Sequence, residues 1–149
     1  MESSEAFRAA VRRIAVVVIL YALLFAIQEV AHGRLDLIWS QSVQLSTLGV
    51  YLVWPLFGLV LLTTSFRRGG GILLMGSLPA GLVFLVVTRF FRTHQPFPPP
   101  EDPGSWRGVY EVSYMLLIAL SVLGSYFAFR IVRLMQPPAG GAPTPPDAD

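Results

Sequence analysis

The chain has 149 residues, of which 54% are hydrophobic and 13% are charged, with a formal net charge of +2 at pH 7. A typical soluble domain carries about 25% charged residues. The much lower charged fraction of this chain therefore excludes a typical soluble domain. The absence of cysteine excludes disulfides, thiol nucleophiles and cysteine-bound metals, and the basic residues do not indicate nucleic-acid binding, because they gather at the ends of apolar runs.

Four apolar runs, at about 14–31, 45–64, 72–88 and 110–132, occupy most of the chain. Each approaches the ~20 residues that a helix needs to cross a lipid bilayer. Glu29 is the only acidic or basic side chain in the first three runs and in the apolar part of the fourth, 112–129. A charge at the bilayer centre costs roughly 3 kcal/mol or more. The sequence therefore predicts an all-α, polytopic membrane protein whose residues 1–135 form a bundle of four transmembrane helices.

Arginine supplies every basic charge, and its distribution predicts the orientation of this bundle. One side of the predicted membrane carries Arg8, Arg12, Arg13, Arg67, Arg68, Arg130 and Arg133, and the other carries Arg34, Arg89, Arg92 and Arg107. Because positive charge favours the cytoplasmic side, we expect both termini in the cytoplasm. The predicted location is the cytoplasmic (inner) membrane of a bacterium or archaeon.

Polar residues at the outer end of the first run form the main candidate site. Glu29 and His32 share a helix face because they are three residues apart. Glu111 and His94 are expected on the same side of the membrane. Together the four side chains could bind a metal such as zinc or relay protons to a quinone. The alternative is a set of ordinary interfacial residues in which Glu29 pairs with Arg89 or Arg92, so no cofactor is predicted.

The second and third runs are predicted to form an antiparallel hairpin with a tight turn at 65–71. Gly69, Gly70 and Gly71 would supply the unrestricted dihedral angles that the reversal requires. Pro55 and Pro79 lie near the middle of these runs, and each is expected to kink its helix. Such a pair could open a cavity or a hinge in a transporter, or could simply reflect the frequency of proline in membrane helices.

Small residues four apart predict close helix packing. The pairs are Ala22 with Ala26, Gly76 with Ala80, Ser77 with Gly81, Ser121 with Ser125, and Gly124 with Ala128. The spacing does not distinguish contacts within one bundle from contacts between chains. Residues 136–149 are rich in proline, glycine and alanine, so we predict a disordered cytoplasmic tail there.

No motif in the chain specifies a reaction, since phosphate loops, nucleophile elbows and zinc-protease motifs are all missing. The sequence favours a non-catalytic accessory or scaffold subunit that packs against other membrane proteins or against copies of itself. One alternative is a small membrane enzyme or a redox-linked or quinone-linked subunit using the Glu29 and His32 cluster. Another is a small transporter hinged at Pro55 and Pro79. Enzymatic activity is left open, with the balance against it.

Overall fold

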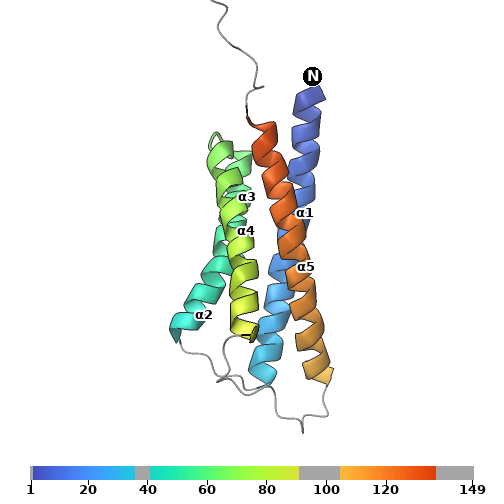
Figure 1. The fold of residues 1–149 in the computed structure, drawn as a ribbon, viewed down its shortest axis with the longest axis vertical. Coiled ribbons are helices and arrows are strands. Elements are labelled where there is room, and N and C mark those ends of the chain that lie inside the picture. The colour runs from blue at the N-terminus through green and yellow to red at the C-terminus, as the bar shows by residue number, and fades with distance from the viewer. Residues whose placement is uncertain (1, 36–40, 91–104, 137–149) are drawn as a thin grey trace, which may run out of the picture.

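A computed structural model describes residues 2–35, 41–90 and 105–136, which are almost entirely helical (Figure 1). Four helices in these ranges are long and apolar enough to cross a membrane: Glu5–Arg34, Gln44–Thr63, Arg67–Val87 and Ser105–Leu134. The predicted all-α class and the four long apolar helices are confirmed. The predicted disordered tail, apart from Gln136, lies outside the described residues.

The helices run alternately up and down in one elongated bundle (Figure 1). The elements in chain order are α1 (Glu2–Arg34), α2 (Gln41–Leu48), the π-helical turn η1 (Gly49–Val53), α3 (Trp54–Thr63), α4 (Arg67–Phe90) and α5 (Ser105–Leu134). Helix α5 packs against both α1 and α4, and α3 packs against α4. The start of α1, the α3–α4 turn and the end of α5 therefore lie together, at what we call the N-terminal end of the bundle.

The helices extend beyond the predicted spans at several ends. Helix α1 has 33 residues, which at 1.5 Å per residue gives about 50 Å, longer than the ~30 Å hydrocarbon core of a bilayer. Its N-terminal turns carry Arg8, Arg12 and Arg13, all exposed. The excess length therefore includes this polar N-terminal part of the helix, and apolar side chains cover most of the rest, up to Glu29.

The second predicted span is one helical path interrupted by a π-helical turn. Within η1, the Trp54 backbone N–H donates to the Gly49 carbonyl, five residues earlier. Pro55 follows near the start of α3 and has no N–H to donate, and in a regular α-helix its ring would press on the Tyr51 carbonyl. A wider turn is a recognised way to accommodate such an interruption. By contrast, α4 continues on both sides of Pro79.

The predicted glycine turn between the second and third spans is wrong. Helix α4 already begins at Arg67, so Gly69 to Gly71 are helical. The reversal is made by residues 64–66, where the Thr64 hydroxyl donates to the Leu61 carbonyl at 2.9 Å and accepts from the Phe66 N–H at 3.1 Å. Because one threonine side chain provides these hydrogen bonds, the glycines are not needed for the turn.

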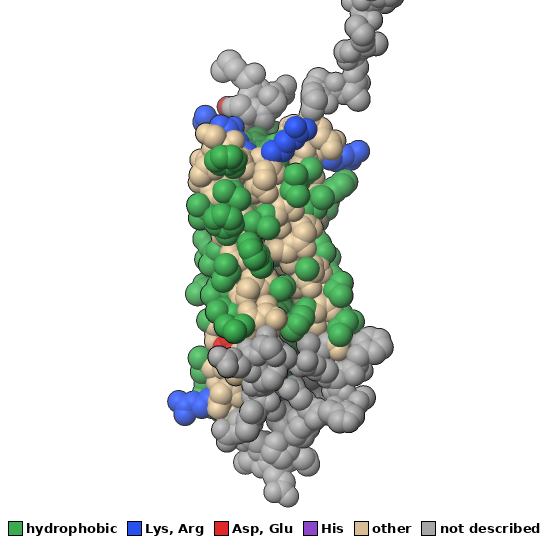
Figure 2. Space-filling model, turned by 90° about the vertical axis from the view of Figure 1, so that its left-hand side faces the viewer, with side chains coloured by type: hydrophobic (Ala, Val, Ile, Leu, Met, Phe, Trp, Pro, Cys, Tyr) green, Lys and Arg blue, Asp and Glu red, His purple; other side chains and the backbone are tan. Residues whose placement is uncertain are grey.

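Apolar side chains both fill the bundle and cover its long sides (Figure 2). Ile14, Val18, Leu74 and Leu78 are completely buried, whereas Met115 on α5 is 66% exposed. Basic side chains gather at the ends of the bundle (Figure 2). An apolar belt of this kind would be a large unfavourable patch in water and suits a surrounding of lipid.

Candidate functional site

Glu29, His32 and Glu111, the described members of the predicted polar cluster, lie at the end of the bundle opposite to the N-terminal end (Figure 1). Glu111 forms an ion pair with Arg107 on its own helix, with 3.3 Å between Arg107 Nε and Glu111 Oε1. Glu29 is exposed and makes no ion pair or hydrogen bond with another described side chain. His94 lies outside the described residues, as do Arg92 and the side chain of Arg89, the expected partners of Glu29.

His32 is the member of this cluster that the fold buries, with 8% of its surface exposed. Its ring packs against Tyr110 of α5, with 5.9 Å between the ring centroids. His32 thus lies beside the residue that precedes Glu111, in a contact between α1 and α5. Within the described residues, no group of three histidine or carboxylate side chains is close enough to hold a metal ion.

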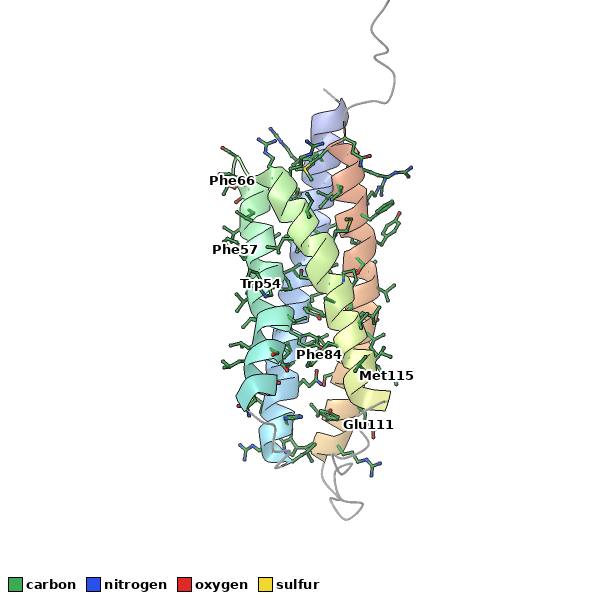
Figure 3. The ribbon with its side chains drawn as sticks, turned by 60° about the vertical axis from the view of Figure 1, so that its left-hand side comes forward. Trp54, Phe57, Phe66, Phe84, Glu111 and Met115 are labelled. Atoms are coloured by element: carbon green, nitrogen blue, oxygen red, sulfur yellow. The ribbon has the colours of Figure 1, made fainter. Side chains whose placement is uncertain are left out.

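An aromatic cluster around Tyr51 fills the bundle in the half that lies away from the N-terminal end. The Tyr51 ring lies 5.9 Å from Tyr21, 5.3 Å from Phe25 and 5.9 Å from Phe84, measured between centroids. Phe84 points from α4 into the bundle, whereas Trp54, Phe57 and Met115 point away from it (Figure 3). The rings therefore occupy the space next to the π-helical turn where a pair of proline breaks could have left a cavity.

Two tyrosine hydroxyls in this region bind the backbone of α4. Tyr51 of η1 donates to the Gly81 carbonyl at 3.1 Å, and Tyr114 of α5 donates to the Leu85 carbonyl. Gly81 and Leu85 are one helical turn apart, so both bonds reach the same side of α4. Because the acceptors are backbone carbonyls of another helix, these hydrogen bonds join η1 and α5 to α4.

Not every buried hydroxyl finds a partner. The hydroxyls of Tyr21 and Ser77 are buried and meet no described partner at ordinary hydrogen-bond geometry, although the Ser121 hydroxyl lies near enough to Tyr21 for a weak hydrogen bond. Tyr21 and Tyr51 were not identified as contact residues from the sequence, although their positions within predicted spans indicate such a role. A tyrosine in the middle of a predicted span needs an acceptor for its hydroxyl, which marks it as a helix-contact residue.

Some of the predicted small-residue pairs face the interior of the bundle, and others lie on its exposed surface. Ser121, Gly124 and Ala128 are buried inside the bundle, where a Cβ atom added to Gly124 would lie 2.9 Å from Leu78 Cδ1. Ser77 and Gly81 are buried too, whereas Ala22 is half-buried and Gly76, Ala80 and Ala26 are exposed. Ser121 and Ser125 donate to carbonyls of α5 itself, at 2.8 and 2.7 Å, and not to another helix.

An apolar groove of about 350 Å³ runs between α1 and α5; its lining includes Leu24, Ile27, Val112 and Leu116. Its polar side chain, Ser113, donates its hydroxyl to the Tyr110 carbonyl at 3.0 Å. The groove can hold a hydrocarbon chain, but its lining offers no charged group to orient a reactive headgroup.

Comparison of the chain with protein-family models, with curated proteins and with solved structures gave no match.

Proposed function

We propose that the chain is a multi-pass protein of the cytoplasmic membrane that acts as a non-catalytic accessory or scaffold subunit. Its four apolar helices and exposed apolar belt support a place in the bilayer. Its interior supports a structural role, because Tyr51 and Tyr114 bind backbone carbonyls and aromatic rings fill the space beside η1. The exposed apolar surface is therefore the part of the bundle available to a partner helix.

The observation that carries this proposal is an open strip of small residues on the outward side of α4. Gly76 and Ala80 are exposed, and a Cβ atom added to Gly76 would meet nothing within 4 Å. Val83 and Val87 continue the strip and are 61% and 45% exposed. The next residues along the helix, Ser77 and Gly81, form the inward side, so the bundle closes without using this strip.

A strip of this kind suits a transmembrane helix of another protein. Small side chains four residues apart let two helix backbones approach closely, and packing of that closeness drives association within lipid. The exposed carboxylate of Glu29 adds a second feature of the outer surface, since a carboxylate that has no ion-pair partner among the described residues and lies near apolar side chains favours a basic partner. The proposed partner is therefore a membrane protein that presents a helix to α4.

Gly76→Leu tests this contact. Gly76 is exposed and the new Cβ atom meets nothing within 4 Å, so we expect normal folding and loss of about 90% of the co-purifying partner. The measurement is purification in mild detergent from native membranes, followed by quantitative mass spectrometry of stoichiometric components. Ala119→Leu is the matched control, because Ala119 is also exposed but lies on α5.

Two results would contradict the proposal. If no stoichiometric protein accompanies the unmodified chain, the subunit assignment fails, and the alternatives based on Glu29 or on Pro55 and Pro79 take its place. If Gly76→Leu and Ala119→Leu retain the partner equally, the α4 strip is not the contact.

The proposed orientation, with both termini in the cytoplasm, has its own test. The chain contains no cysteine, so Gly69→Cys and Ser105→Cys each introduce a single label at an exposed position, at opposite ends of the bundle. In intact cells, a membrane-impermeant maleimide should label the variant at 105 and reach the one at 69 only after permeabilisation. The reverse pattern would show that the arginine-rich end faces outward.

A further inference from the structure

A pocket of about 620 Å³ opens at the N-terminal end of the bundle, where α1, α3, α4 and α5 meet. Arg8 and Arg12 of α1 and Arg67 at the start of α4 line it. All three arginines are exposed, as are most of the basic side chains that Figure 2 shows at this end. Three cations from two helices therefore converge on one opening.

No acidic side chain lines this pocket, and none of its three arginines has an ion-pair partner among the described residues. The Arg67 guanidinium lies over the Phe7 ring, 5.9 Å from its centroid, in a cation–π contact. That contact holds Arg67 at the opening without neutralising its charge. The pocket mouth is therefore a positively charged site whose counter-charge is not supplied by the described part of the chain.

Part of the pocket lining is apolar. Val11 and Ala15 of α1, Leu62 of α3 and Leu134 of α5 form this part. Leu62 is only 2% exposed, so this part continues into the hydrophobic core of the bundle. A ligand that fills the pocket must combine an anionic head with a hydrocarbon part.

We propose that this pocket binds an anionic phospholipid of the adjacent leaflet, with its phosphate between Arg8, Arg12 and Arg67 and part of an acyl chain against Leu62 and Leu134. Arginine binds phosphate oxygens through two parallel N–H donors, which gives both affinity and orientation. Basic pockets between transmembrane helices are suited to acidic headgroups. The proposal concerns this chain alone and does not depend on the partner protein proposed above.

The test compares two triple variants that remove the same charge from the same end of the bundle. Arg8→Gln, Arg12→Gln and Arg67→Gln together remove the cations of the pocket. Arg68→Gln, Arg130→Gln and Arg133→Gln together remove three exposed cations that do not line it. The full chain is reconstituted in phosphatidylcholine nanodiscs, and binding of phosphatidylglycerol is measured by native mass spectrometry. We expect about 100-fold weaker binding in the pocket variant and less than a threefold change in the other.

Three outcomes would overturn the proposal. Equal losses in both triple variants would show that the whole basic end attracts anionic lipid without a defined site. Unselective binding of phosphatidylglycerol and phosphatidylcholine would show that the phosphate site does not recognise net charge. Displacement of the lipid by millimolar glycerol phosphate or inorganic phosphate would identify a site for a soluble phosphate. If the pocket variant does not fold, Arg12→Gln and Arg130→Gln give the same comparison, with an expected fivefold loss only in the first.

Discussion

Replacing Gly70 with alanine is expected to destabilise the bundle by about 2 kcal/mol, although it adds a single methyl group and alanine favours helices. Gly70 is buried where α3 and α4 cross. A Cβ atom there would lie 2.7 Å from the Gly58 carbonyl oxygen, 2.7 Å from the Leu62 backbone nitrogen and 2.9 Å from Leu61 Cβ. Two of these neighbours are backbone atoms, so the helices must separate to admit the methyl group.

Gly69→Ala is the matched control, because Gly69 is exposed and nothing lies within 4 Å of an added Cβ atom. At this position only helix propensity changes, so the stability should stay the same or rise by up to about 1 kcal/mol. The measurement is reversible unfolding in mixed micelles with increasing sodium dodecyl sulfate, followed by circular dichroism. Opposite signs for two adjacent glycines are the expected result, and equal effects would contradict the close α3–α4 contact.

These glycines show what the sequence could not establish. A run of three glycines between two apolar segments is typical of a tight turn, and the sequence predicts one there. The structure instead gives the reversal to Thr64 and places Gly70 in a helix crossing. Both uses of glycine depend on the missing side chain, so the residue type alone cannot distinguish them. What decides between them is how close Gly70 lies to α3, and this depends on the tertiary packing of two helices and not on the local sequence.

The class of fold, by contrast, follows directly from the sequence. Four apolar runs of about 20 residues with almost no charge predict four long helices, because a helix satisfies its backbone hydrogen bonds within the segment itself. The same local pattern cannot determine which side of a helix faces inward. Gly76 with Ala80 and Ser77 with Gly81 have identical spacing, yet the first pair is exposed and the second is buried. The sequence therefore predicted which small residues pack against a helix, but it could not show which of them face the interior of the bundle and which face outward.

The position of the π-helical turn also could not be predicted from the sequence. Pro55 indicated an irregularity in the second span, but the turn that accommodates it lies on the N-terminal side of the proline, at Gly49–Val53. The turn presents Tyr51 to Gly81, and the resulting hydrogen bond joins it to α4 two residues beyond Pro79. The two proline regions are thus linked by a direct bond, which favours a fixed contact over a hinge.

Replacing Gly81 with alanine is expected to lower the stability of the bundle, and a second substitution, Tyr21→Phe, should restore most of it. In Gly81→Ala, the new Cβ atom would lie 2.6 Å from the Tyr21 hydroxyl oxygen, while its next neighbour, Tyr51 Cε1, is at 3.6 Å. We expect a loss of about 2 kcal/mol in stability, caused almost entirely by this one oxygen atom. Tyr21→Phe removes the oxygen and, because that hydroxyl makes at most a weak hydrogen bond, to Ser121, should itself change stability by no more than about 1 kcal/mol.

The double variant Gly81→Ala with Tyr21→Phe is therefore expected to recover most of the lost stability, with a coupling energy of about 1–2 kcal/mol between the two positions. Tyr51→Phe is the control for the second position. It removes a hydroxyl that donates to Gly81 and does not clash with the new methyl group, so it should add a loss of about 1 kcal/mol and repair nothing. The same detergent unfolding assay measures the three single variants, the two double variants, in which Gly81→Ala is combined with Tyr21→Phe or with Tyr51→Phe, and the unmodified chain. Recovery with Phe at position 21 but not at 51 would mean that position 81 requires glycine because the Tyr21 hydroxyl of α1 lies against it, whereas additive effects would place Tyr21 elsewhere.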